Sequence, residues 1–305
     1  MFRGSSLSSH PRTPLDSEGS ARHFSRRNFL IGSGAAAGLA LYAGEIARHE
    51  LEVTTPTIHI ANLPEAFHGY RIAQLSDIHL EEYTEPYFLQ HVIQRVNALA
   101  PDLVLLTGDF VSRGPLGHAV DVRAAGRCGE LLAGLTCPLR YASLGNHDVT
   151  VGAAMVTDHL RSTGTPVLIN QHVAVERQGQ RLWIAGLDDA TGGFSDAALA
   201  VPERPDGPVI LMAHEPDYAD VLIAGPRREQ IDLVLSGHSH GGQIRLPFLP
   251  PLTLPPMGEK YFEGHYHFGR MQLYVNRGIG TVGIPFRLFC PPEVTLFTLQ
   301  PALPA

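Results

Sequence analysis

After residue 54, the chain alternates between segments with the apolar spacing of a helix and short apolar runs typical of strands. Between Tyr87 and Leu99, apolar residues recur every three or four positions, which predicts an amphipathic helix. Leu103–Leu106 is a continuous apolar run bounded by Pro101 and Gly108, too short for a helix, and it predicts a buried strand. These two patterns repeat along the chain.

The repeats define a fold class. Helical spacing recurs at Arg123–Leu132 and Ala153–Leu160. Short apolar runs predict further strands at Tyr70–Leu75, Leu139–Leu144, Arg181–Ala185, Val209–Ala213, Ile231–Leu235, Met271–Val275 and Val294–Leu299. Strands that alternate with helices and are followed by more strands predict an α/β fold, a layered α/β-β/α sandwich with mixed sheets.

The stretch Leu246–Met257 breaks the pattern, because five prolines stand among its apolar residues. Proline excludes a helix interior and is disfavoured in a central strand. The stretch begins three residues after Gln243, and we expect it near the functional site described below. It is either an apolar lip that touches substrate or membrane, or a rigid loop packed on the body.

The N-terminal region has a composition of its own. Residues 1–24 are rich in Ser, Pro, Gly and Arg and show no hydrophobic periodicity, which predicts disorder. Arg26 and Arg27 then precede an uncharged, Gly/Ala-rich stretch over residues 29–44. This arrangement resembles a bacterial twin-arginine export signal. We therefore expect an N-terminal segment over residues 1–47 and one domain over residues 54–300.

The resemblance to an export signal implies a place in the cell. The twin-arginine translocase would deliver the folded chain to the periplasm or cell envelope, with metals loaded beforehand in the cytoplasm. The uncharged stretch is shorter than the about 20 residues of a membrane-spanning helix. A removed signal, a membrane tether over residues 29–44, and an amphipathic or buried helix all stay open.

Composition excludes some classes of function. Hydrophobic residues make up 44% and charged residues 17% of the 305 residues, as in a globular protein. The net charge is −7 although residues 1–47 are net basic, so the rest of the chain is acidic and no basic patch predicts nucleic-acid binding. Cys128, Cys137 and Cys290 lack metal-type spacing, and they are either buried thiols or include one disulfide pair.

Five polar motifs follow the apolar runs in a fixed order. They are Asp77-Ile78-His79, Gly108-Asp109, Gly145-Asn146-His147-Asp148, His214-Glu215 and Gly237-His238-Ser239-His240. Two of them place ligand-type residues at i and i+2, which on an extended segment points both side chains the same way. We expect the carboxyl ends of the strands to bring these side chains to one site.

The side chains in these motifs are typical metal ligands. Seven candidates supply carboxylate, amide or imidazole groups: Asp77, His79, Asp109, Asn146, His214, His238 and His240. The absence of thiolates argues against a structural zinc site. Seven ligands exceed the needs of one ion, and two divalent ions about 3.5–4 Å apart are the arrangement that hydrolyses phosphate esters. Ligand hardness favours Mn, and the set also accepts Fe or Zn.

The ordered motifs resemble those of the calcineurin-like metallophosphoesterase family, whose signature is DxH, GD, GNH(D/E), H and GHxH. All five blocks are present over residues 77–240, and the similarity extends over residues 58–299. The resemblance implies one metal bound by Asp77, His79, Asp109 and His240. It implies a second metal bound by Asp109, Asn146, His214 and His238. It also implies a hydroxide that bridges the metals and attacks phosphorus, while His147 contacts the phosphate and protonates the leaving oxygen.

One departure from the family narrows the substrate. The protein phosphatase branch reads GDxVDRG in its second block, and its second Asp orients the catalytic histidine. Ser112 stands in place of that Asp, which argues against phosphoprotein substrates. Arg113 is a candidate phosphate contact, with a solvated surface arginine as the alternative. Residues 276–280, 285–287 and 291–293 resemble the bacterial exported or membrane-associated branch.

These observations predict a metal-dependent phosphoesterase of the cell envelope that hydrolyses diesters in preference to monoesters. Its substrate would be a phosphoester, lipid-linked or cell-wall-linked. One alternative is a pyrophosphohydrolase that acts on a UDP-diacylglucosamine-type lipid of lipid A synthesis. Another class is a non-catalytic metal-binding protein of the cell wall, against which the intact His147 argues, because metal binding alone does not require it.

Overall fold

The computed structural model describes residues 26–113 and 118–302 of the chain. The expectation of disorder over residues 1–24 lies outside the described residues. The contacts divide the chain into two units, one that ends at Leu39 and one that runs from Ala40 onward. Each unit is described by itself below, and the second is called the body.

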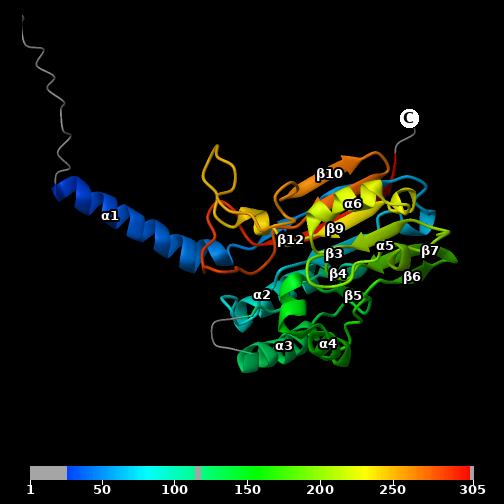
Figure 1. The fold of residues 1–305 in the computed structure, drawn as a ribbon, viewed down its shortest axis with the longest axis horizontal. Helices are drawn as coiled ribbons and strands as arrows, with labels where there is room; N and C mark the ends of the chain where they lie inside the picture. Colours follow the sequence, from blue (N-terminus) through cyan, green and yellow to red (C-terminus); the bar gives the residue numbers. More distant parts are fainter. Residues whose placement is uncertain (1–25, 114–117, 303–305) are drawn as a thin grey trace, which may run out of the picture. The chain divides into compact units, whose positions relative to one another are not determined.

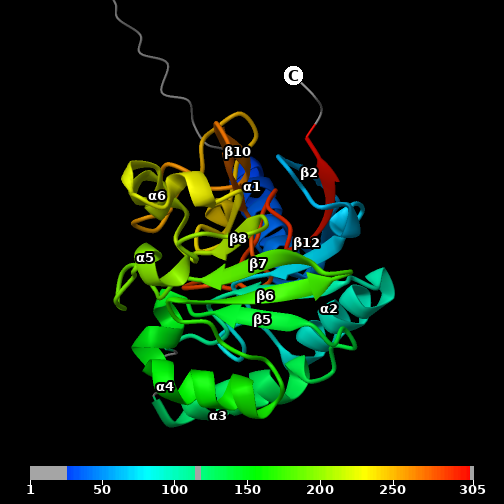
Figure 2. The same ribbon diagram turned by 90° about the vertical axis from the view of Figure 1, so that its right-hand side faces the viewer.

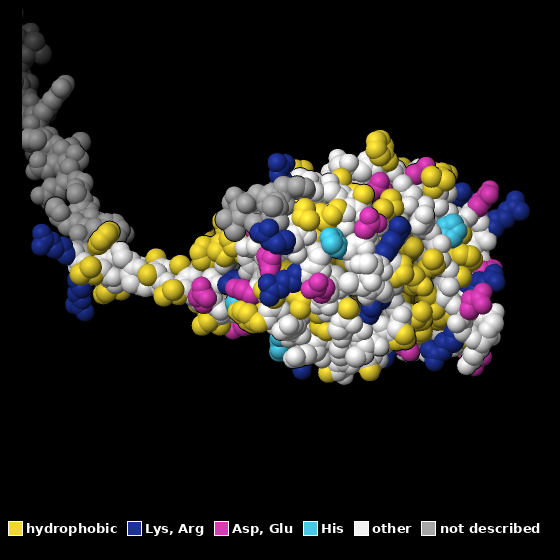
Figure 3. Space-filling view, turned by 90° about the horizontal axis from the view of Figure 1, so that it is seen from below, with side chains coloured by type: hydrophobic (Ala, Val, Ile, Leu, Met, Phe, Trp, Pro, Cys, Tyr) yellow, Lys and Arg dark blue, Asp and Glu magenta, His cyan; other side chains and the backbone are white. Residues whose placement is uncertain are grey.

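The described residues of the N-terminal unit belong to one helix, α1, whose full extent is Arg26–Leu41. In the space-filling view, apolar side chains are spread along it between white, uncharged surface, with basic groups at its N-terminal end (Figure 3). Helical backbone continues through a π-helical turn at Tyr42–Ile46 and a 3-10 turn at Ala47–His49. The helical stretch is therefore longer than the uncharged stretch of the sequence. By length and composition it can cross a membrane, a test that a signal sequence also passes.

The first sheet of the body contains six strands. They are β1 (Glu52–Thr54), β2 (Thr57–Ile60), β3 (Arg71–Leu75), β4 (Leu103–Thr107), β5 (Arg140–Ser143) and β12 (Glu293–Pro301). The order is β1-β12-β3-β4-β5, with β2 also paired to β12 (Figure 1). Strands β3, β4 and β5 run parallel to one another, and β12 is antiparallel to β3. The sheet is therefore mixed, as predicted.

The second sheet also contains six strands, in the order β10-β11-β9-β8-β7-β6. Their bounds are β6 (Gln171–Arg177), β7 (Gln180–Gly186), β8 (Val209–Met212), β9 (Leu233–Ser236), β10 (Gly264–Phe268) and β11 (Met271–Val275). The four central strands are parallel, and an antiparallel hairpin closes each edge. The parallel centres of both sheets deliver the loops that form the site.

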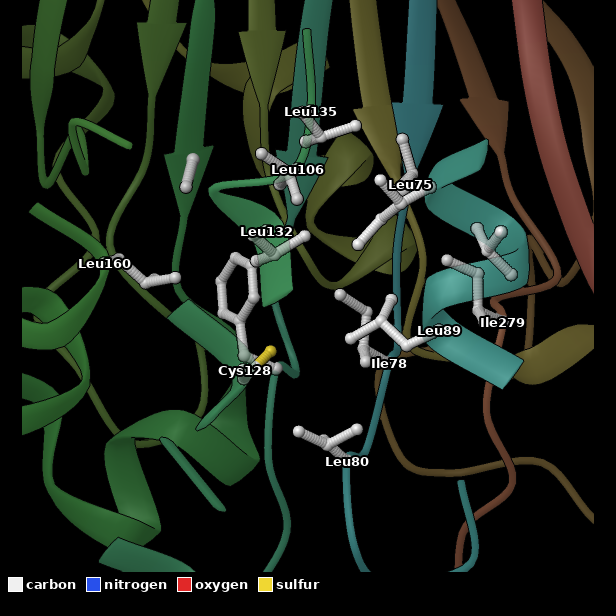
Figure 4. Close-up of a cluster of buried hydrophobic side chains, with 14 of the residues drawn as sticks. Leu75, Ile78, Leu80, Leu89, Leu106, Cys128, Leu132, Leu135, Leu160 and Ile279 are labelled. Atoms are coloured by element: carbon white, nitrogen blue, oxygen red, sulfur yellow. The ribbon is translucent and has the colours of Figure 1, made fainter. Parts of the chain in front are cut away.

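Helices cover the outer faces of both sheets (Figure 2). Helices α2 (Pro86–Leu99), α3 (His118–Leu132) and α4 (Asn146–Ser162) pack on the first sheet. Helices α5 (Ala197–Ala200) and α6 (Ala219–Ala224) pack on the second. Short 3-10 turns occur at Glu65–Phe67, Pro216–Tyr218, Arg228–Gln230 and His240–Gly242. Figure 4 shows Leu89 and Leu132 of these helices facing Leu75 and Leu106 of the first sheet.

A separate apolar layer joins the two sheets. Ile72 and Leu105 from the first sheet and Ile210 from the second are fully buried in it. Phe297 and Tyr274 meet edge to face, with ring centroids 4.9 Å apart. Helix, sheet, sheet and helix thus form four layers, and the predicted α/β-β/α sandwich is confirmed.

The predicted elements are present, and the differences have local causes. Helix α3 begins at His118, five residues before the predicted start. Helix α4 begins at Asn146 instead of Ala153, and Gly152, with a φ of 143°, interrupts it and hides the early turn from the apolar pattern. The pattern also missed the short edge strands β1, β2, β6 and β10. The proline-rich stretch contains no helix or strand, as predicted.

Replacing Phe297 by Ala should lower the free energy of unfolding by about 3–5 kcal/mol, because it leaves a cavity in the layer between the sheets. Phe248→Ala is the matched control, since the Phe248 side chain is fully exposed and buries nothing. Urea titration of both variants measures the difference. Equal unfolding midpoints for the two variants would contradict this description of the core.

Candidate metal centre

The candidate ligands lie at the carboxyl ends of parallel strands from both sheets. Asp77 and His79 follow β3, Asp109 follows β4, and Asn146 follows β5. From the second sheet, His214 follows β8, while His238 and His240 follow β9. The predicted placement at strand ends is therefore correct, and the centre lies where the ends of the two sheets meet.

The backbone at five of these seven positions is left-handed and not extended. The φ angle is 52° at Asp77, 48° at His79, 55° at Asp109, 67° at His238 and 50° at His240. The expectation that extended backbone aligns the i and i+2 side chains was wrong, because each loop turns sharply as soon as its strand ends. Residues other than glycine rarely adopt this conformation, and such strain concentrates at functional sites.

Two glycines of the motifs allow the loops to approach closely. A Cβ atom on Gly237 would lie 2.0 Å from Ser76 Oγ and 2.1 Å from Asp77 Oδ2. A Cβ atom on Gly145 would lie 2.3 Å from Asp109 Oδ1. Both positions require glycine because any side chain would displace a candidate ligand.

The potential ligand atoms form overlapping groups. Within each group, all ligand atoms lie within 4.8 Å of one another. The groups are Asp77 with His79 and His240, His79 with Asp109 and His147, and Asp109 with His214 and His238. Asp109 therefore occupies the middle of the cluster, between two sets of ligands.

Several buried atoms in the cluster lack hydrogen-bond partners among the described residues. These atoms include Asn146 Oδ1 and His214 Nε2. The Nε2 atoms of His79 and His240 face each other at 3.0 Å, and His240 Nε2 lies 3.4 Å from Asp77 Oδ1. Lone pairs converge at these places, and a cation between them would satisfy all of these atoms. The residues present therefore fit divalent metal ions.

In two of the imidazoles, the ring nitrogen that faces away from the centre makes a hydrogen bond that orients the ring. The Nδ1–H of His214 donates to the carbonyl of Thr107 at 2.7 Å, which turns Nε2 toward Asp109 Oδ2 at 3.1 Å. The Nε2–H of His238 donates to the carbonyl of Pro256 at 2.9 Å, which leaves Nδ1 for the centre. A carbonyl fixes the tautomer in both cases, as is usual for metal-binding histidines.

Burial keeps three of the imidazoles neutral. It lowers the pKa of His79 to about 3, the pKa of His238 to about 4, and the pKa of His240 well below its usual value. Burial also lowers the pKa of His214, but the carboxylates of Asp109 and Asp77 outweigh it and raise the pKa well above its usual value. Neutral His79 and His238 bind a metal ion without first losing a proton.

Asp148 supports the centre, a role that its motif alone did not predict. Its buried carboxylate accepts backbone N–H bonds from Asp109 at 2.8 Å, Phe110 at 2.9 Å and Gly145 at 3.0 Å. It therefore joins the loop after β4 to the loop after β5. The sequence indicates this role only through the position of Asp148, an acidic residue directly after the ligand motif and in the first turn of a helix.

Two more buried groups contact the ligands. Ser112 Oγ hydrogen-bonds Nδ1 of His79, so the residue that replaces the phosphatase carboxylate orients a candidate metal ligand. Glu215 is buried beside His214. Its burial is the main cause that raises its pKa to about 8, and a hydrogen bond with Asp189 is the second. Asp189 is fully buried, and it accepts N–H bonds from its own turn. This turn lies beside the motif of His214, because the backbone N–H of Ala190 donates to Glu215 at 3.1 Å.

A cavity of about 710 Å³ opens onto the centre. Asp109, Asn146 and His147 line its polar side, together with His238 and His240. Its apolar side consists of Ile244, Leu252, Leu254, Pro255, Pro256, Val282 and Ile284. The proline-rich stretch therefore lies at the mouth of the centre. Arg113 is exposed and is not among the residues that line the cavity.

Comparisons with known proteins agree with this geometry. The family model for calcineurin-like phosphoesterases matches residues 70–242. The chain is 36% identical to the metallophosphoesterase YkuE of Bacillus subtilis, over 92% of this chain and 99% of that protein. It is 30% identical to the phosphodiesterase YaeI of Escherichia coli, over 75% of this chain and 82% of that protein.

A third relative is the UDP-2,3-diacylglucosamine pyrophosphatase LpxG of Chlamydia trachomatis. The chain is 31% identical to it, over 77% of this chain and 86% of that protein. The family match covers more than half of the chain and includes every block of the motif series. The chain therefore belongs to the calcineurin-like phosphoesterase family, and it is a dinuclear-metal-dependent hydrolase that acts on phosphoester bonds.

Proposed function

We propose that two divalent ions occupy the two sides of Asp109. The first set of ligands is Asp77, His79, Asp109 and His240. The second set is Asp109, Asn146, His214 and His238. The facing Nε2 atoms of His79 and His240 and the unpartnered Oδ1 of Asn146 support this assignment, because each needs a cation to satisfy its lone pair. Ligand hardness favours Mn in both positions over Fe or Zn.

The bound ions would supply a hydroxide nucleophile at neutral pH and neutralise the phosphoryl oxygens. His147 has the position for proton transfer. Its backbone N–H donates to Asp109 Oδ1 at 2.9 Å, and its ring stands perpendicular to that of His79 with centroids 4.9 Å apart. The ring lines the cavity, where it meets the leaving oxygen of a bound ester and protonates it.

The proposed reaction is phosphodiester hydrolysis in the cell envelope, with monoesters as poorer substrates. The observation that carries the proposal is the cavity of about 710 Å³, in which Asp109, His147 and His238 lie beside apolar walls that would accept the substituents of a diester. The pairing of Ser112 with His79 supports the exclusion of phosphoproteins, since no carboxylate takes the phosphatase position. Arg113 stays a predicted phosphate contact.

A second candidate reaction is pyrophosphate hydrolysis in a nucleotide-linked lipid. The apolar side of the cavity favours it, because acyl chains would pack against Leu252, Leu254 and Ile284. The similarity to LpxG supports the same substrate class. A panel that contains a phosphodiester, a phosphomonoester and a UDP-linked diacyl sugar separates the two reactions.

Export by the twin-arginine translocase completes the proposal. Arg26 and Arg27 stand at the start of α1, ahead of a helical stretch with the length and apolar character of a signal or an anchor. The proposed location is the periplasm or envelope, with α1 removed or kept as a tether. Changing Arg26 and Arg27 to Lys should keep the chain in the cytoplasm, as fractionation of cells would show.

Substitution of a ligand and of His147 should affect activity differently. Asp109→Asn and His238→Ala should abolish hydrolysis of bis-p-nitrophenyl phosphate together with metal content. His147→Ala should keep the metal content and lower kcat about 10²–10⁴-fold, because it removes only the proton donor. Steady-state kinetics and elemental analysis of the same samples measure both effects. Full activity in Asp109→Asn would refute the mechanism.

Metal removal should inactivate the protein reversibly. A chelator should remove the ions, and Mn should restore more activity than Zn if ligand hardness decides the preference. Gly237→Ala should prevent reconstitution, because the new Cβ displaces the carboxylate of Asp77. Gly126→Ala in α3 is the control, since its Cβ would make an ordinary contact of 3.4 Å with the His159 ring. Normal metal content in Gly237→Ala would contradict the expected displacement of Asp77.

A further inference from the structure

Most of the exposed large apolar side chains of the body come from three of its segments. Two are loops beside the cavity, and the third is the end of the helical stretch at residues 41–46. We call the apolar residues of the two loops the rim. The rim consists of Leu246, Phe248, Leu249, Leu252, Ile284 and Phe289.

The two loops of the rim are held together by backbone contacts. Ile244 and Leu288 form a β-bridge, and the amide of the Gln243 side chain donates to the carbonyl of Ile284 at 3.1 Å. Pro251 packs so closely on Gly242 that a Cβ there would lie 2.3 Å from it. The rim is therefore one continuous surface feature.

Two phenylalanines of the rim combine an exposed ring with a strained, left-handed backbone. Phe248 is fully exposed with a φ of 68°, and Phe289 is 62% exposed with a φ of 51°. A bulky residue rarely adopts left-handed backbone, and neither ring gains core burial that would offset the strain. Such residues indicate a contact with something outside the body.

The rim is continuous with the point where the chain leaves the body toward α1. Arg287 donates its backbone N–H to the carbonyl of Ala43 at 3.1 Å, and Gly44 lies directly against the ring of Phe286. Tyr42 and Ile46 in this segment are themselves exposed. The loop of Ile284 and Phe289 is therefore bonded to the segment through which the chain continues toward α1.

We propose that the rim docks on a lipid bilayer and inserts its apolar side chains into the interface. The occupant is a lipid surface because the segment joined to the rim is the end of a helical stretch with the length and composition of a membrane span. Neither basic residue of the rim loops offers a free charge: Arg245 is paired with Glu263 at 2.5 Å, and the Arg287 side chain is fully buried. Docking therefore depends on apolar insertion, and it is insensitive to salt and to lipid charge. The same orientation directs the mouth of the metal centre toward the membrane surface.

Site-specific labels on the full-length protein test this proposal. Phe248→Cys and Phe289→Cys would carry an environment-sensitive fluorophore, and the natural cysteines do not compete because all three are buried. Leu199→Cys is the matched control. Leu199 is exposed on α5, at the opposite end of the body from the rim loop (Figure 1). A tether through α1 would bring all three labelled variants to the vesicle equally. A difference in quenching between them therefore reports which surface of the body contacts the bilayer.

Each protein would be reconstituted in phosphatidylcholine vesicles with and without nitroxide-labelled lipid. We expect a blue shift and quenching at positions 248 and 289, no quenching at position 199, and no change as salt is raised. Adding Leu249→Asp and Leu252→Asp should abolish quenching at position 289. Equal quenching at all three positions, or none at 248 and 289, would overturn the proposal.

A blue shift at position 248 without vesicles, in a sample that has dimerised, would assign the rim to a second copy and also overturn the proposal. The readout is independent of hydrolysis. Loss of docking and loss of the proposed activity are therefore separate outcomes.

Discussion

The rest of the centre depends on the hydrogen bonds that the carboxylate of Asp148 accepts. The carboxylate accepts backbone N–H bonds from residues 109–111 after β4 and from Gly145 after β5. These bonds fix the loops that present Asp109 and Asn146, and they draw the start of α4 against the end of β4. A buried carboxylate needs several donors to be tolerated, and here the donors are the backbone of the candidate metal site itself.

The loops above Asp148 store strain that the folded sheets hold in place. Five of the candidate ligands have left-handed backbone, and Gly145 and Gly237 let the loops approach within van der Waals contact. Parallel strands buried in the four-layer core fix where each loop begins. The arrangement leaves little freedom for reorganisation when charge develops on a substrate, which is how electrostatic catalysis is achieved in such sites.

The sequence predicted the four-layer fold and the convergence of the motifs, because buried strands appear as apolar runs and the ligand motifs follow them directly. It failed where side-chain pattern does not report the backbone. The extended conformation assumed for Asp77 and His79 was wrong, since φ is not visible in spacing. Gly152 concealed the first turns of α4. The pairing of Ser112 with His79 connects different strand ends, so only the fold reveals it.

The most direct test of the central claim is anomalous diffraction from crystals grown with Mn. The account predicts two peaks that flank Asp109, one beside Asp77, His79 and His240 and the other beside Asn146, His214 and His238, about 3.5–4 Å apart. A single peak within this cluster, or peaks that avoid Asp109, would contradict it.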